Sequence, residues 1–258
     1  MNSALLSAAF VAASILFSIP ANAGWIAANF TAGGMPVNVY QCVPDTIGAH
    51  PAVIMLHGAS GNLGHGYGDF EKICTDLAAA GYFTEFIEYY SQTGAVGVDH
   101  PVQMMEDFPV WLAEIKSGID ALDKNPAVDP HRVAMVGYSL GAFLSLATGA
   151  SQPHRISAVV EYYGGLPIEM EPDITALPPT LIIHGEKDSI VPVAKAHELD
   201  ALMTKYNRPH EMVLYPDANH AFNFPGLRIW YNAADAKDSW TKTLNFLAAN
   251  LKNPAANH

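Results

Sequence analysis

Ser139 lies between Gly137 and Gly141 in the stretch MVGYSLGAF, which spans residues 135–143. The apolar residues before this serine favour a buried strand, and the small residues after it favour a helix. A serine at such a sharp strand–helix turn exposes its hydroxyl above the sheet, where the positive end of the helix favours a developing oxyanion. The pattern therefore predicts a nucleophilic serine, and the alternative is a small residue packed in a tight turn.

A serine hydroxyl becomes a nucleophile only when a base takes its proton, and that base is most often a histidine oriented by an acid. Asp188 follows the apolar run of LIIHGEKDSIVP, and His220 follows that of YPDANHAFNF. Both should therefore lie beyond the ends of strands, on the edge where Ser139 emerges. Glu186 remains a rival acid, whereas Asp217 is so close to His220 in sequence that an Asx turn is favoured.

A tetrahedral intermediate at Ser139 would need hydrogen-bond donors for its negatively charged oxygen. The N–H of Leu140, directly after the serine, is one candidate. The other is the N–H of Ala59, because a strand is expected to end at His57 and Gly58 lets the backbone approach closely. The alternative for this second segment is an ordinary glycine turn.

The bulk composition excludes some functions. The formal net charge of −12 is unsuited to a nucleic-acid partner, since phosphate binding needs a basic surface. Eleven histidines are present, but no H-E-x-x-H spacing occurs among them. We therefore expect no metal and no cofactor, and a small molecule as the substrate.

The elements that must position these residues alternate between short apolar runs and helical patterns. This alternation predicts an α/β fold with a mostly parallel sheet and helices on both faces, in one domain over residues 24–258. Residues 91–100 should form a loop at the carboxyl edge of the sheet, and whether it acts as a lid stays open. Strands are expected at 51–56, 82–90, 132–137, 156–163, 180–184 and 211–215, and helices at 70–80, 108–122, from 140 onward, 193–206 and 240–251.

The N-terminal segment reads as a targeting signal. Residues 4–17 form an apolar run, and Ala21-Asn22-Ala23 resembles a cleavage site. Residues 1–23 are therefore predicted to be a signal peptide, with export to the periplasm or the outside and no membrane anchor after cleavage. In an oxidising compartment Cys42 and Cys74 could pair, but two buried free thiols fit the sequence equally well.

Taken together, the motifs resemble the α/β-hydrolase fold and, within it, the dienelactone hydrolase family. The resemblance covers nearly the whole chain after the targeting signal and rests on VIMLHGASG, MVGYSLGAF, VVEYYGGLP, LIIHGEKDSIVP and YPDANHAFNF. It implies a catalytic triad of Ser139, Asp188 and His220. It also implies an oxyanion hole made by the N–H groups of Ala59 and Leu140.

The sequence differs from the best-known members of that family at three places. They carry a cysteine where Ser139 stands and a glutamate at the position that Gly58 matches. They also hold a substrate carboxylate with two arginines, whose positions match Gln92 and Phe224 here. A serine without a cationic clamp resembles a general ester hydrolase for uncharged substrates. The residues predicted to contact substrate are Tyr90, Gln92, Tyr138 and Phe224.

The function expected from the sequence is that of an exported serine hydrolase that cleaves carboxylic esters or lactones through an acyl-enzyme on Ser139. Two alternatives stay open. A peptidase of the prolyl-oligopeptidase kind would use the same triad order, although the sequence shows no propeller or large cap domain and no charged clamp for a peptide terminus. A non-catalytic binding protein on a hydrolase scaffold is possible because a fold does not determine a function.

Overall fold

A computed structural model describes residues 24–61, 67–167 and 173–252 of the 258-residue chain. The predicted signal peptide, residues 1–23, lies outside the described residues. Within the described part of the chain, no helix is long and apolar enough to cross a membrane.

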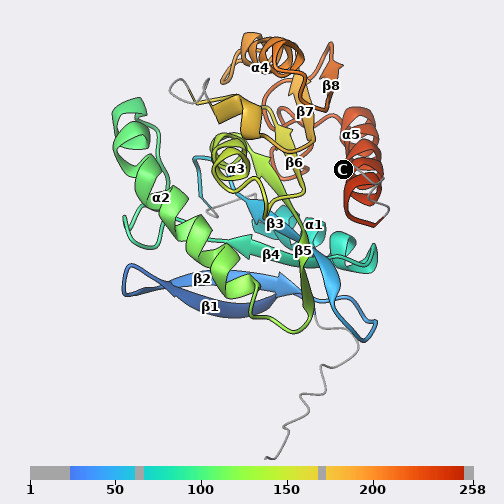
Figure 1. The fold of residues 1–258 in the computed structure, drawn as a ribbon. Helices are drawn as coiled ribbons and strands as arrows, with labels where there is room; N and C mark the ends of the chain where they lie inside the picture. The colour runs from blue at the N-terminus through green and yellow to red at the C-terminus, as the bar shows by residue number, and fades with distance from the viewer. Residues whose placement is uncertain (1–23, 62–66, 168–172, 253–258) are drawn as a thin grey trace, which may run out of the picture.

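The core of the molecule is one eight-stranded sheet with the order β1-β2-β4-β3-β5-β6-β7-β8 (Figure 1). The six strands from β4 to β8 run parallel, whereas β2 is antiparallel to both β1 and β4. The carboxyl ends of the parallel strands therefore share one edge. The strands are β1 (Ile26–Ala32), β2 (Met35–Cys42), β3 (His50–Leu56), β4 (Phe83–Ile87), β5 (Val128–Tyr138), β6 (Ala158–Tyr162), β7 (Thr180–Gly185) and β8 (His210–Tyr215).

Helices cover both faces of this sheet (Figure 1). Side chains of α2, α3 and α4 belong to the apolar cluster on one face, and those of α1 and α5 belong to the cluster on the other. The helices are α1 (Tyr67–Ala79), α2 (Pro101–Leu122), α3 (Leu140–Ser151), α4 (Ala194–Lys205) and α5 (Ala233–Leu247), which a short π-helix (Ala248–Lys252) continues. The mostly parallel α/β architecture predicted from the sequence is thus confirmed.

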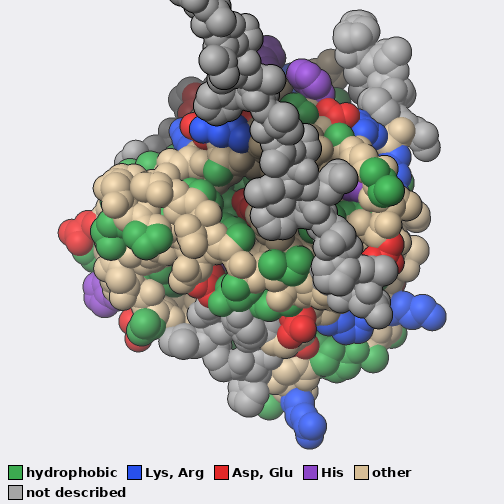
Figure 2. All heavy atoms as spheres, turned by 90° about the horizontal axis from the view of Figure 1, so that it is seen from below, with side chains coloured by type: hydrophobic (Ala, Val, Ile, Leu, Met, Phe, Trp, Pro, Cys, Tyr) green, Lys and Arg blue, Asp and Glu red, His purple; other side chains and the backbone are tan. Residues whose placement is uncertain are grey.

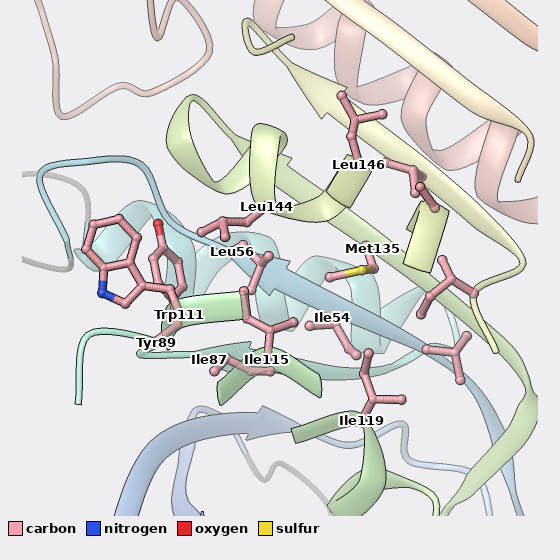
Figure 3. Packing of buried hydrophobic residues seen from close by; sticks show 14 of the residues in the cluster. Ile54, Leu56, Ile87, Tyr89, Trp111, Ile115, Ile119, Met135, Leu144 and Leu146 are labelled. Atoms are coloured by element: carbon pink, nitrogen blue, oxygen red, sulfur yellow. The ribbon is translucent and has the colours of Figure 1, made fainter. Parts of the chain in front are cut away.

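The face covered by α2 shows how the sequence pattern becomes packing. Trp111, Ile115 and Ile119 recur at intervals of four residues and are fully buried against the sheet. In Figure 3, Ile115 and Ile119 lie next to Ile87 and Ile54 of the central strands, and Trp111 lies beside Tyr89. Side chains of this size each stabilise the fold by roughly 2 kcal/mol when they leave water.

The N-terminal hairpin and the starts of two helices differ from the sequence-based expectation. The hairpin of β1 and β2 was not expected, because about half of its side chains face solvent and leave no continuous apolar run. Its turn at Gly33 and Gly34 has positive φ at both residues, 54° and 82°, as a two-residue hairpin turn requires. Helix α2 begins at Pro101 rather than near 108, because the His100 side chain accepts a hydrogen bond from Val102 N and caps an exposed first turn. Helix α5 begins at Ala233 rather than at 240, because the Asn232 side chain accepts hydrogen bonds from Ala234 N and Asp235 N and caps its first turn.

The two cysteines, which the sequence could not pair, form a disulfide. Cys42 at the end of β2 is bonded to Cys74 in α1, with a Cα–Cα distance of 5.8 Å. Both residues are fully buried. The bond ties the antiparallel hairpin to a helix on the face opposite α2.

The surface shows no single dominant feature on the face drawn in Figure 2. There the described acidic and basic side chains are scattered among polar and apolar ones rather than gathered into one patch. Exposed large apolar side chains include Val96, Met105, Ile190 and Ile229, which all lie in or next to loops at the carboxyl edge of the sheet.

Candidate active site

Ser139 occupies the turn between β5 and α3 with a φ of 55°, a backbone conformation that residues other than glycine rarely adopt. Its backbone N–H is fixed by a hydrogen bond of 2.9 Å to the Tyr162 carbonyl on the neighbouring strand. A Cβ atom on Gly137 would lie 2.2 Å from Gly141 O, and one on Gly141 would lie 2.4 Å from Leu56 O. The two flanking glycines are therefore needed for the close approach of strand and helix, as the motif predicts.

The structure brings Ser139, His220 and Asp188 together although they are far apart in the sequence. His220 Nε2 lies 3.0 Å from Ser139 Oγ, and His220 Nδ1 lies 2.8 Å from Asp188 Oδ2. Since a carboxylate only accepts, Nδ1 carries the proton and Nε2 is free to accept from the serine hydroxyl. Ser139 follows the end of β5, Asp188 follows β7 and His220 follows β8, and all three strands are parallel.

The environment of Asp188 keeps it ionised. Burial alone would raise the pKa of this carboxyl, but the contacts with His184 and His220 and the N–H of Ile190 outweigh burial and hold the pKa of Asp188 far below its usual range. Its Oδ1 accepts hydrogen bonds from Ile190 N and Val191 N, each of 2.8 Å. The carboxylate therefore remains an acceptor for His220 at neutral pH.

The two rival acids lie elsewhere. Asp217 forms an exposed ion pair with Lys187, and Glu186 is exposed. Among the described residues, the carboxylate in contact with His220 is that of Asp188.

The N–H of Ala59, predicted from the sequence to bind an oxyanion, is oriented by the peptide group between Gly58 and Ala59. Gly58 O accepts from Gly61 N at 3.0 Å and lies 2.8 Å from His57 Nδ1. Burial lowers the pKa of His57 to about 4, so that its ring is neutral. Because a trans peptide directs its N–H opposite to its carbonyl, the Ala59 N–H points away from these partners. Gly58 itself lies next to Ser139, since a Cβ atom built on Gly58 would be 3.8 Å from Ser139 Oγ.

Leu140 carries the first of the two N–H groups predicted to bind an oxyanion. As the first residue of α3, its N–H has no acceptor within the helix, and the helix dipole adds positive potential at the same place. Tyr89 and Tyr90 fix the backbone beside the second donor, since their hydroxyls donate to His57 O at 2.7 Å and to Ala59 O at 3.1 Å. Tyr90, predicted to contact substrate, thus contacts the Ala59 loop.

The other residues predicted to contact substrate lie in different surroundings. The rings of Tyr138 and Phe224 are buried, with centroids 5.1 Å apart, and both also contact Phe70. Gln92 does not reach Ser139, because its side-chain amide lies against Gly33 in the β1–β2 turn. In the sheet, β4 and β3 separate that hairpin from β5.

Two residues beside His220, Asn219 and Trp230, were missed by sequence reasoning, whereas Tyr163 was expected near the site. Asn219 joins the loops of the acid and the base, since its Oδ1 accepts from Ser189 N at 2.9 Å and from His220 N at 2.7 Å. Its position directly before His220 was the only available signal. Tyr163 and Trp230 flank the imidazole, with ring centroids 4.7 and 6.3 Å from that of His220.

A parallel sheet with a serine elbow after β5, and with an acid and a histidine after the last two strands, defines an α/β-hydrolase fold. The chain belongs to the dienelactone hydrolase family, whose model matches residues 37–251. By family it is therefore a hydrolase.

Individual relatives support this assignment. A protein of Escherichia coli (strain K12) named "Putative carboxymethylenebutenolidase" is 28% identical, over 95% of this chain and 94% of its own length. One of the same name from Synechocystis sp. is 27% identical, over 83% of this chain and 92% of its own. The solved structure titled "Putative Dienelactone Hydrolase", from Klebsiella pneumoniae, has a TM-score of 0.73 at 25% identity and covers 87% of this chain and 98% of its own.

Proposed function

We propose that this protein hydrolyses carboxylic esters or lactones through an acyl-enzyme on Ser139. The observation that carries the proposal is the chain of two hydrogen bonds from Ser139 Oγ through His220 to Asp188. In that arrangement a buried carboxylate fixes the tautomer of an imidazole whose other nitrogen faces a serine in a strained turn.

The reaction follows from these contacts. His220 Nε2 takes the hydroxyl proton while Ser139 Oγ bonds to the ester carbonyl carbon, and the carbonyl oxygen becomes an oxyanion. The N–H groups of Ala59 and Leu140 bind that oxyanion, each contributing about 3 kcal/mol to the transition state. His220 then gives the proton to the leaving alkoxide. A water molecule, activated by the same imidazole, releases the acid from the serine.

The substrate proposed is an uncharged ester or lactone. The positions that the resemblance assigns to carboxylate-binding arginines hold Gln92 and Phe224, and the side chains flanking His220 are aromatic. A relative from Bradyrhizobium sp., 25% identical, is named as a probable lactonase, which is why cyclic esters are included.

Export is part of the proposal. The apolar run and the Ala21-Asn22-Ala23 sequence support cleavage before Gly24 and a periplasmic or secreted location. The disulfide between Cys42 and Cys74 is consistent with an oxidising compartment.

Hydrolysis of p-nitrophenyl acetate, compared with an ester that carries a free carboxylate, tests this proposal. We expect turnover of the neutral ester and its loss in Ser139→Ala. Turnover that survives in this variant would contradict the role of Ser139. Folded native protein without activity on any ester would favour the binding-protein alternative. Acylaminoacyl peptidases share the fold at 14% identity, but this chain covers only 43% of their length, so the peptidase alternative gains no support beyond the fold.

A further inference from the structure

A second imidazole lies beside the acid of the proposed triad. His184, near the end of β7, is fully buried, and its Nε2 is 2.9 Å from Val191 O and 3.4 Å from Asp188 Oδ2. Because a carbonyl can only accept, Nε2 carries a proton, and this N–H faces the same carboxylate oxygen that binds His220. The proposed mechanism gives this imidazole no part.

A buried carboxyl lies behind this imidazole. Glu161 of β6 is opposite Ile182 of β7, so His184, two residues further along β7, shares its face of the sheet. Glu161 Oε2 accepts from Gly164 N at 2.8 Å, whereas Glu161 Oε1 and His184 Nδ1 are buried without a hydrogen-bond partner among the described residues. Such groups are costly in an apolar layer, which indicates a role beyond packing.

The two groups also influence each other electrostatically. Burial acts to lower the pKa of His184, but Asp188 and Glu161 outweigh it, and the pKa is raised. Burial raises the pKa of Glu161 to about 7, although the field of His184 acts against this. Together they therefore favour a proton on the imidazole that faces Asp188.

We propose that His184, backed by Glu161, is a positioning residue that holds the Asp188 carboxylate toward His220. Its N–H fixes Val191 O, while Val191 N donates to Asp188 Oδ1. Val191 is thus hydrogen-bonded through both its carbonyl and its N–H, which fixes the loop that carries Asp188. Without the imidazole, His220 is the one partner that Asp188 Oδ2 keeps among the residues the structure describes, and the carboxylate can turn away from it.

This inference rests on the proposed function, so its test measures the reactivity of Ser139. The probe is a fluorophosphonate, which reports both the maximal inactivation rate and the concentration for half-maximal rate. In His184→Leu we expect the maximal rate to fall about 10- to 100-fold with little change in the half-maximal concentration, because the nucleophile is misaligned while its pocket remains. In His184→Gln the side-chain amide keeps a donor near Nε2, and we expect most of the rate to return.

His210 provides a matched control. Like His184, it contacts a backbone carbonyl and an aspartate, namely Arg208 O at 2.8 Å and Asp200 Oδ1 at 3.1 Å. Unlike His184, it lies at the start of β8, on the edge of the sheet opposite Ser139. His210→Leu should lower the melting temperature without lowering the inactivation rate.

Four outcomes overturn the inference in distinguishable ways. If His184→Leu reacts at the native rate, or if His184→Gln loses as much rate as His184→Leu, then His184 does not act through its N–H. If His210→Leu loses as much rate as His184→Leu at equal loss of stability, the effect is general destabilisation. If native folded protein does not react at Ser139 at all, the proposed function fails first, and the inference fails with it.

Discussion

His220 makes the two contacts that determine what the serine can do, 3.0 Å to Ser139 Oγ and 2.8 Å to Asp188 Oδ2. Replacing the acid by its amide, Asp188→Asn, offers a donor to Nδ1 and favours the wrong tautomer of the ring. We expect kcat for p-nitrophenyl acetate to fall by about 10³- to 10⁴-fold with KM nearly unchanged. Steady-state kinetics measure this, and a variant within about threefold of native kcat would argue against Asp188 as the acid.

Glu85 provides a prediction about stability that does not involve the reaction. It is buried on β4, where its Oε2 accepts a hydrogen bond from Gln41, and burial raises its pKa from 4.5 to about 7. A carboxyl whose pKa is higher in the folded state stabilises the fold below about pH 4.5, and this contribution is lost as the pH rises through 7.

Glu85→Gln removes this titration. Between pH 4.5 and about pH 8, the free energy of unfolding of the native protein should therefore fall relative to that of the variant, by up to about 3 kcal/mol. Urea unfolding at both pH values measures the difference, with Glu71→Gln on the exposed face of α1 as the control. Equal pH dependence in native protein and Glu85→Gln would show that Glu85 does not titrate in this range.

At the residue scale, the sequence predicted that Ser139, Asp188 and His220 come together, because each follows an apolar run in the expected order. It did not predict where Gln92 and Tyr90 point, since side-chain direction at a strand end depends on which loops pack there. The roles of Asn219 and His184 were also out of reach, because each depends on a contact between two loops or strands that no local pattern encodes.

At the element scale, the elbow depends on the close approach of β3, β5 and α3. A Cβ atom on Gly141 would lie 2.4 Å from both Leu56 O and His57 O, and neither backbone group can move without disturbing β3. We expect Gly141→Ala to lower the free energy of unfolding by about 2 kcal/mol or more and to abolish activity. Gly68→Ala in α1 is the control, since among the described residues no atom outside the adjoining helix backbone lies within 4 Å of its Cβ position. Similar melting temperatures for the two variants would contradict this account of the elbow.

The parallel strands could be predicted from the sequence, whereas the β1–β2 hairpin could not. Inner parallel strands such as β3 and β7 were found because strands buried on both faces read as continuous apolar runs. The β1–β2 hairpin was missed because it is partly exposed, with only Val37, Val39 and Cys42 buried along β2. Its Gly33-Gly34 turn was the available signal.

At the scale of the whole molecule, the disulfide closes a loop between residues separated by 32 positions. Such a crosslink restricts the unfolded chain and stabilises the fold by about 3 kcal/mol. We expect the double variant with Cys42→Ser and Cys74→Ser to lose this amount in denaturant unfolding. The sequence shows two cysteines but does not give the distance between them in space. If reduction and the double substitution both leave stability unchanged, the bond does not form in the protein.

Export is the second whole-molecule prediction. Expression of the full chain in a Gram-negative bacterium should yield mature protein in the periplasm that begins at Gly24, which N-terminal sequencing determines. The replacement of Ala21 and Ala23 by bulky residues should block cleavage. Full-length protein that begins at Met1 and remains in the cytoplasm would contradict export.

The central claim is that Ser139 is an activated nucleophile. Treatment of the native protein with a fluorophosphonate, followed by intact-mass analysis and peptide mapping, tests it most directly. The account predicts a single adduct on Ser139, lost in His220→Ala. Folded protein that remains unlabelled, or an adduct on another residue, would contradict it.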